Sequence, residues 1–472
     1  MSEAFMPLSD LPEMMVPSHS YYFDHVFLDA GWQSHCLVTV KAGVISQIDP
    51  APSPSSIAAA ESVKGWALPG LPNLHSHCFQ RGMAGLSERR GLSSDSFWTW
   101  REVMYRFLDR LDPEAVEDIA AFAMLEMIER GYTALAEFHY LHHDPQGNPY
   151  ANRAEMAERI IAAAHKTGLC LTLLPVFYAH GNFGGQAPQE GQRRFINSLD
   201  GYEQLLGDTQ RGLHAVPDGK IGVAPHSLRA VTEQELASLL TLAPEGPIHI
   251  HIAEQLKEVS DCVTWSGARP VEWLLDKMPV DHRWCLVHAT HMNERETKQL
   301  AASQAIAGLC PITEANLGDG IFPATDFITS GGAFGVGSDS NIEISAAHEL
   351  RWLEYGQRLN LRGRNMLAKE AGQSTGEALY RMACRSGAQA LNQAIGSIAV
   401  GKRADFVVLN ENHPSLAGHK SDSIMDSYLF VAGHDAIDRV IAGGKTWVMD
   451  GRHHHHDDIT RRYQACMKRI LS

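Results

Sequence analysis

Two histidines separated by one residue, His75 and His77, follow an apolar run that is interrupted by Gly70 and two prolines. Side chains at positions i and i+2 of a strand point to the same face, so both imidazoles would reach one point at the end of a strand. A parallel barrel builds its active site at that end. Alone, the pair is more typical of surface histidines near a turn, and a metal site requires further ligands from later strands.

Later apolar segments supply such candidates. His251 is followed three residues later by Glu254, His288 ends the next segment, and Asp339 lies in a Gly-Ser-Asp-Ser turn. Three imidazoles and one carboxylate from these positions would form a nitrogen–oxygen site suited to zinc or iron(II). A water in an open position would make that centre hydrolytic. His249, two residues before His251, is interpreted as a buried hydrogen-bonded residue or as a residue that supports a ligand.

The segments that carry these residues alternate with helical patterns. Helix-like stretches occur at 113–130, 154–167, 232–242 and 294–303, and strand-like stretches near 67–77, 133–140, 169–178, 220–226, 247–254, 284–290, 305–311 and 333–340. This alternation is typical of a parallel α/β architecture, and eight strands close a (β/α)8 barrel of the TIM type. An open doubly wound sheet is the alternative, although the chain lacks its Gly-x-Gly-x-x-Gly fingerprint.

Both ends of the chain have the pattern of short strands separated by turns. We therefore expect a small β-sandwich domain built from residues 1–66 and 393–452, with the barrel over residues 67–392. Residues 453–472 would form a C-terminal tail or helix. The four consecutive histidines at 453–456 are interpreted as part of a solvated tail that could bind adventitious metal.

The composition of the chain indicates which kinds of partner it is unsuited to bind. The formal net charge of −15 argues against nucleic acid or an anionic membrane as the main partner. The first residues contain acids and prolines in place of a signal peptide, and no apolar run has the length of a membrane span. The eight cysteines form no Cys-x-x-Cys motif. We expect a cytoplasmic enzyme for a small molecule, assembled as a homodimer.

The ordered set His75-x-His77, His251, His288 and Asp339, wrapped by a split β domain, resembles the amidohydrolase superfamily. Strand four ends in Ala224-Pro-His226-Ser and has no lysine that could bridge two metals, so the pattern is similar to the mononuclear deaminase branch. Longer strings resemble the bacterial N-formimino-L-glutamate deiminases of histidine degradation. They include Pro72-Asn-Leu-His-Ser-His-Cys-Phe-Gln-Arg81, Asp95-Ser-Phe-Trp-Thr-Trp-Arg-Glu102, Ala136-Glu-Phe-His-Tyr140, His226-Ser-Leu-Arg-Ala-Val231 and Thr313-Glu-Ala-Asn-Leu-Gly-Asp-Gly320.

The resemblance implies one divalent metal ion, zinc with iron(II) as the alternative, and a hydrolysis that releases ammonia and N-formyl-L-glutamate. It implies that Glu254 carries a proton to the departing nitrogen, His288 hydrogen-bonds the incoming oxygen and Asp339 takes a proton from water. The implied metal ligands are His75, His77, His251 and Asp339, and the implied substrate-binding residues are Gln80, Arg101, Tyr140, His226 and Arg229. Asn341 departs from the family pattern, which includes histidine there, but leaves Asp339 untouched.

A dicarboxylate substrate fits two arginines, because the planar guanidinium fork matches a carboxylate in a bidentate way. An ion pair of Arg101 with Glu102 on a helix surface is an equally good interpretation of that residue. A deaminase of a ring amine, such as guanine or an adenosine derivative, would use the same metal site. A non-catalytic scaffold is a further alternative, since a fold alone does not decide function.

Overall fold

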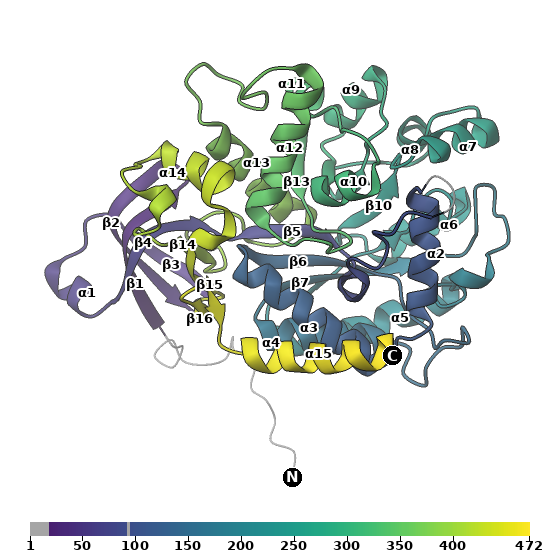
Figure 1. Cartoon of the computed structure of the whole chain (residues 1–472), viewed down its shortest axis with the longest axis horizontal. Coiled ribbons are helices and arrows are strands. Elements are labelled where there is room, and N and C mark those ends of the chain that lie inside the picture. The colour runs from purple at the N-terminus through teal and green to yellow at the C-terminus, as the bar shows by residue number, and fades with distance from the viewer. Residues whose placement is uncertain (1–17, 92–94) are drawn as a thin grey trace, which may run out of the picture.

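The computed structural model describes residues 18–91 and 95–472. A barrel of parallel strands and helices occupies one side of the molecule, and a sheet built from both chain ends occupies the other (Figure 1). None of the helices in the described ranges combines the length and apolarity needed to cross a membrane.

The barrel strands lie where the sequence predicts them. They are β5 (Leu71–Ser76), β6 (Tyr132–His139), β7 (Cys170–Phe177), the divided fourth strand β8 (Lys220–Ile221) and β9 (Ala224–Pro225), β10 (Ile248–Ile252), β11 (Trp284–His288), β12 (Ile306–Leu309) and β13 (Ala333–Val336). Parallel pairing runs from β5 to β8 and from β10 to β13.

Three single bridges close the barrel. Val223 pairs with Ile248 and Ser227 with His251, which joins strand four to strand five. Ser76 pairs with Asp339, which joins the eighth strand to the first. The predicted (β/α)8 fold is therefore confirmed, and the open doubly wound alternative is wrong because both edges of the sheet are paired.

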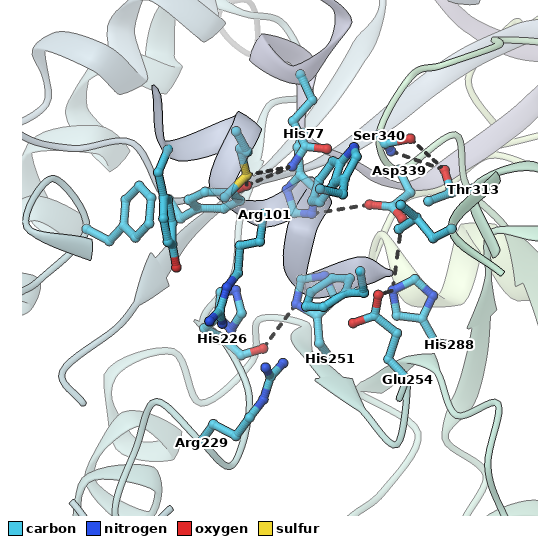
Figure 2. Close-up of a pocket in the computed structure, with 18 of the residues that line it drawn as sticks. His77, Arg101, His226, Arg229, His251, Glu254, His288, Thr313, Asp339 and Ser340 are labelled. Carbon is cyan, nitrogen blue, oxygen red and sulfur yellow. Dashed lines mark hydrogen bonds and ion pairs between the residues drawn. The ribbon is translucent and has the colours of Figure 1, made fainter. Parts of the chain in front are cut away.

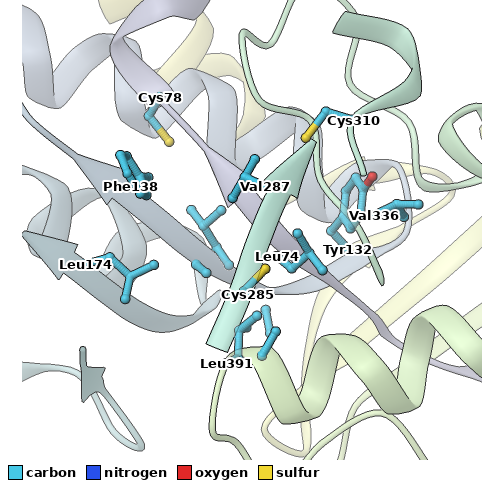
Figure 3. Packing of buried hydrophobic residues seen from close by; sticks show 14 of the residues in the cluster. Leu74, Cys78, Tyr132, Phe138, Leu174, Cys285, Val287, Cys310, Val336 and Leu391 are labelled. Carbon is cyan, nitrogen blue, oxygen red and sulfur yellow. The ribbon is translucent and has the colours of Figure 1, made fainter. Parts of the chain in front are cut away.

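The interior of the barrel is a packed apolar core, and Leu74 of β5 lies within it (Figure 3). A Cβ added at Gly335 would lie 2.3 Å from Leu74 Cδ2, and one added at Gly308 would lie 2.9 Å from Leu74 Cδ1. The two glycines make room for this leucine. Strands buried on both faces explain why their sequences are apolar without alternation.

Helices cover the outside of the barrel. They are α3 (Pro113–Glu129), α4 (Glu155–Thr167), α5 (Leu199–Gly212), α6 (Glu233–Leu242), α7 (Leu256–Ser266), α8 (Pro270–Lys277), α9 (Glu294–Ala302), α10 (Pro311–Leu317), α11 (Ala324–Thr329), α12 (Ala346–Leu361) and α13 (Thr375–Ala390). An additional helix, α2 (Phe97–Leu108), precedes α3 and stands at the carboxyl ends of the barrel strands (Figure 1). Ser96 caps it by accepting a hydrogen bond from the backbone N–H of Trp98.

The second sheet has the strand order β17-β16-β15-β14-β4-β1-β2-β3. Its N-terminal strands are β1 (Ser18–Leu28), β2 (Gly31–Lys41), β3 (Val44–Asp49) and β4 (Glu61–Pro69), and its C-terminal strands are β14 (Phe406–Leu409), β15 (Ile437–Ala442), β16 (Lys445–Met449) and β17 (Arg452–His453). Short helices α1 (Pro54–Ala58) and α14 (Asp422–Ser427) lie in its connections. The predicted β domain from both ends is present. Its strands form one continuous sheet, because β4 pairs with both β1 and β14.

The histidine tract at 453–456 joins β17 to the C-terminal helix, so the interpretation as a tail is wrong, although His454 and His455 are exposed to solvent. His453 is buried in β17, and His456 begins the C-terminal helix α15 (His456–Leu471). Glu129 accepts hydrogen bonds from the backbone N–H of His453 and from His456 Nδ1, both at 2.8 Å. The helix then runs along α3 (Figure 1), where Tyr463 stacks on Phe122 with ring centroids 4.1 Å apart.

Candidate metal and substrate site

Four side chains converge at the carboxyl end of the barrel. His75 lies in β5, His77 follows that strand, His251 lies in β10 and Asp339 follows β13. All four are buried, and one donor atom from each lies within 4.8 Å of the others. The Nε2 atom of His75 is 3.2 Å from Nε2 of His77 and 3.1 Å from Nε2 of His251. The barrel therefore assembles a buried group that could bind a metal ion.

Hydrogen bonds determine which ring nitrogen is free. His77 Nδ1 donates to the carbonyl of Phe138 at 2.9 Å, and His251 Nδ1 donates to the carbonyl of His226 at 3.1 Å. The two Nε2 atoms consequently carry lone pairs that face the same point. Burial lowers the pKa of His75 to about 3 and also lowers the pKa of His77 and His251, so the neutral, ligating forms are favoured. Converging acceptors of this kind fit a bound cation.

Backbone hydrogen bonds hold Asp339 beside His75 and His77. Its N–H donates to the carbonyl of His75 and its carbonyl accepts from the N–H of His77, both at 3.0 Å. Its Oδ1 lies 3.5 Å from His75 Nε2 and 3.3 Å from His77 Nε2. Burial opposes ionisation of Asp339, but the neighbouring histidines prevail and hold its pKa well below the usual range. The carboxylate is thus charged and directed at the three imidazoles.

His288 and Glu254 lie beside this group (Figure 2). His288 Nε2 is 3.9 Å from both Glu254 Oε1 and Asp339 Oδ2, while its Nδ1 is 3.3 Å from Glu314 Oε1. Burial raises the pKa of Glu254 to about 7. Burial lowers the pKa of His288, but the carboxylates of Glu254, Glu314 and Asp339 outweigh it and raise that pKa to about 10. His288 has a positive φ of 68°, a strained conformation typical of functional residues.

Cys310 belongs to a second possible ligand group, with His288 and Asp339. Burial, the carboxylate of Asp339 and that of Glu314 raise the pKa of its thiol well above the usual value. A protonated thiol is a poor metal ligand. The group of three histidines and Asp339 is therefore the better metal site.

The predicted substrate-binding residues line one pocket above the metal group. Its wall contains Gln80, Arg101, Tyr140, His226, Arg229, Glu254, His288 and Asp339. Gln80 Nε2 donates to Tyr140 Oη at 2.7 Å, so the amide and the phenol are held together at the ends of neighbouring strands. His226 is partly buried, and its desolvation together with the charge of Arg229 keeps its pKa well below the usual value.

Arg101 and Arg229 lie on one side of the pocket, and Glu254 and His288 lie across it (Figure 2). Among the described residues, neither arginine has a carboxylate within the 4.0 Å of an ion pair, and the Nε atom of each is buried without a hydrogen-bond partner. The interpretation of Arg101 as an ion-pair partner of Glu102 is therefore wrong. Two guanidinium groups that lack an ion-pair partner could bind anions at this end of the pocket.

Comparison with known proteins agrees with this geometry. The protein-family model described as "Amidohydrolase family" matches residues 66–447 of this chain. The chain belongs to the amidohydrolase family. The predicted resemblance and the expectation of an amidohydrolase-type hydrolase are thereby confirmed.

Two similar amidohydrolases extend over nearly the whole chain. A formimidoylglutamate deiminase of Pseudomonas aeruginosa is 49% identical over 452 residues, which are 95% of this chain and 99% of that protein. A crystal structure of an amidohydrolase from Brucella melitensis has a TM-score of 0.92 at 47% identity, covering 96% of this chain and 100% of its own.

A more distant amidohydrolase structure shares the fold. An adenosine deaminase from Xanthomonas campestris, with bound zinc, has a TM-score of 0.79 at 21% identity and covers 96% of this chain and 98% of its own. At that identity the likeness shows the fold alone.

Sequence reasoning missed several residues of this amidohydrolase site. Tyr178 directly follows β7 and lines the pocket, so the rule that active sites lie at strand ends could have found it. Glu314 contacts His288, and its place in the family-like string of residues 313–320 was the available signal for it. Helix α2 supplies Phe97, Trp100, Met104 and Tyr105 to the pocket wall. The pattern of a helix does not show which face meets a site formed by other segments.

Proposed function

We propose that this amidohydrolase is a metal-dependent formimidoylglutamate deiminase, which hydrolyses N-formimino-L-glutamate to N-formyl-L-glutamate and ammonia. The observation that carries the proposal is the anion receptor of Arg101 and Arg229, placed across one pocket from the metal group and Glu254. The substrate has two carboxylates at one end and an amidine at the other. The identity of 49% with the Pseudomonas aeruginosa enzyme supports the same substrate.

The metal site proposed here consists of His75, His77, His251 and Asp339, and zinc fits its borderline nitrogen–oxygen donors. A bound zinc ion would act as a Lewis acid and lower the pKa of a coordinated water to about 7. Asp339 would accept a proton from the attacking water. His288, protonated beside its carboxylates, donates a hydrogen bond to the oxygen that adds to the formimino carbon.

Glu254 acts on the nitrogen. Its carboxylate pairs with the amidinium, and its pKa of about 7 lets it accept and return a proton near neutral pH. A C–O bond forms at the formimino carbon and the C–N bond to the terminal nitrogen breaks, with Glu254 delivering the proton that makes ammonia. Gln80, Tyr140 and His226 bind the part of the substrate between the amidine and the carboxylates, and the two arginines bind the carboxylates.

Ammonia release from purified, zinc-loaded protein tests the proposal. N-formimino-L-glutamate should turn over, whereas guanine, adenosine and S-adenosylhomocysteine should not. Loss of the metal on dialysis against a chelator should abolish the reaction, and zinc should restore it. Efficient release of ammonia from a purine, with no reaction of formiminoglutamate, would identify a ring-amine deaminase instead.

A further inference from the structure

Trp98, in the first turn of α2, lies close to both Arg101 and Arg229. Its ring centroid is 4.7 Å from the Cζ atom of Arg101 and 5.8 Å from that of Arg229. Both distances are inside the range of roughly 6 Å in which a cation is attracted to the face of an aromatic ring. Tryptophan gives the strongest such interaction.

The three residues come from two separate parts of the fold. Trp98 and Arg101 are three residues apart on α2 and therefore share a face of that helix. Arg229 lies in the segment after β9. The indole thus links the helix over the pocket to the barrel at the point where substrate carboxylates would bind.

No carboxylate of the described residues lies at ion-pair distance from either arginine to fix its position, although Glu258 and Glu254 stabilise the charge of Arg229 from farther away. Within the described part of the chain, neither guanidinium forms an ion pair, and each leaves its buried Nε without a partner. Two like charges at one end of a pocket repel each other, and a nearby carboxylate would neutralise the receptor. The negative face of an aromatic ring attracts both cations without occupying their hydrogen-bond donors.

We propose that Trp98 is a positioning residue that holds Arg101 and Arg229 ready to bind two carboxylates, and so sets the preference for a dicarboxylate substrate. This inference rests on the proposed function for its substrate. Trp98 is outside the lining of the pocket, so it acts through the arginines and not by touching the substrate. A receptor held in its binding conformation gains affinity because less ordering is needed on binding.

Trp98→Leu removes the aromatic face and keeps an apolar side chain. For N-formimino-L-glutamate we expect KM to rise by about tenfold while kcat changes less, as loss of two weak cation–π contacts predicts. For 4-(formimidoylamino)butanoate and 2-(formimidoylamino)butanoate, which each lack one carboxylate, KM should change less, so the preference for the diacid shrinks. Trp98→Phe, which restores an aromatic face, should recover most of that preference.

Two control variants test whether the effect comes from losing another cation near Trp98 or from losing an indole elsewhere in the protein. Lys257 Nζ also lies 5.8 Å from the Trp98 ring, but it is paired with Asp261 at 2.5 Å, so Lys257→Met should leave the diacid preference intact. Trp352, exposed on α12 away from the pocket, controls for loss of an indole in Trp352→Leu. Zinc content and thermal melting verify that each variant is folded.

Binding of glutarate, a dicarboxylate that cannot react, separates the two proposals. By calorimetry the zinc-loaded protein should bind glutarate more tightly than butyrate, and Trp98→Leu should reduce that difference. If formiminoglutamate is not hydrolysed but this result holds, the proposed function fails and the role of Trp98 stands. An unchanged KM and unchanged diacid preference in Trp98→Leu, or a fall in kcat and zinc content alone, would overturn the role of Trp98.

Discussion

At the scale of single residues, Glu254 and His288 have pKa values shifted by different causes. Burial raises the pKa of Glu254 to about 7. The carboxylates around His288 overcome its burial and raise its pKa to about 10. Two titratable groups in one site with separated pKa values are typical of an acid–base division of labour. Here Glu254 exchanges a proton near neutral pH, while His288 keeps its proton and donates a hydrogen bond.

Glu254→Gln should therefore abolish most turnover without loss of metal. The amide has the same shape as the carboxylate but cannot carry a proton to the departing nitrogen, and such acid–base assistance contributes about 10²–10⁴ in rate. Ammonia release and elemental analysis of the same sample measure the two effects. The exposed Glu245→Gln serves as the control. Normal turnover in a zinc-replete Glu254→Gln protein would remove this residue from the mechanism.

The arginines should determine substrate class. Arg229→Met and Arg101→Met should each lower kcat/KM for formiminoglutamate by the equivalent of about 2–4 kcal/mol, because one carboxylate then lacks its charged partner. Zinc content should not change, since neither residue contacts the metal group. Steady-state kinetics with the diacid and its mono-acid analogues measure the effect. Arg385→Met, an exposed residue outside the pocket, is the matched control, and equal losses for diacid and mono-acid would contradict the assignment.

At the scale of elements, the ends of the barrel strands were predictable and the helix over them was not. The end of a strand can be recognised in the sequence where an apolar run changes to polar residues. The positions of His77, His288 and Asp339 at strand ends could therefore be predicted from the sequence alone. Helix α2 is an insertion between strand one and α3, and its orientation depends on contacts far away in the chain. From this helix only Arg101 was predicted, and only through the family resemblance.

The sequence predicted the turn after β13 but not the hydrogen bonds that Asn341 makes in it. Asn341 Nδ2 donates to the carbonyls of His77 and Asp339 and to Ser76 Oγ, at 3.0–3.1 Å. Asp339 and Asn341 have positive φ values of 44° and 55°. The residue that departs from the family pattern therefore ties the turn that carries Asp339, a proposed metal ligand, to the end of β5.

Asn341→Ala should weaken metal binding while the protein stays folded. The variant removes these hydrogen bonds and places alanine at a positive φ, which frees Asp339 from its position. Residues that support metal ligands typically contribute about 10–100-fold in affinity, and competition with a chelator measures the change. Asn392→Ala provides the control, because Asn392 also has a positive φ, of 51°, but is exposed and far from the metal group. Equal zinc affinity in both variants would show that the turn does not depend on Asn341.

At the scale of the whole molecule, the alternation of strands and helices was sufficient to predict a barrel, and the β-rich ends were sufficient to predict a joint domain. The continuity of that domain in one sheet was not predictable, because β4 joins strands that are over 300 residues apart in the chain. The histidine tract was misinterpreted for a related reason. Its burial depends on Glu129, which is 324 residues from His453 in the chain, so no local pattern connects the two. The homodimer stays a prediction.

We expect the whole molecule to hold one divalent metal ion at the barrel. Removal of that metal should lower the stability of the folded protein. A ligand at 1,000 times its dissociation constant stabilises the folded state by about 4 kcal/mol, so chelation should lower the melting temperature by several degrees. His454 and His455 are exposed members of the tract. The double variant His454→Ala/His455→Ala keeps the Glu129 contacts and should retain one equivalent of metal and the full melting shift. His75→Ala/His77→Ala should lose both. If the tract variant instead lost its metal, and the barrel variant kept it, the metal would belong to the tract and the hydrolytic site would need another explanation.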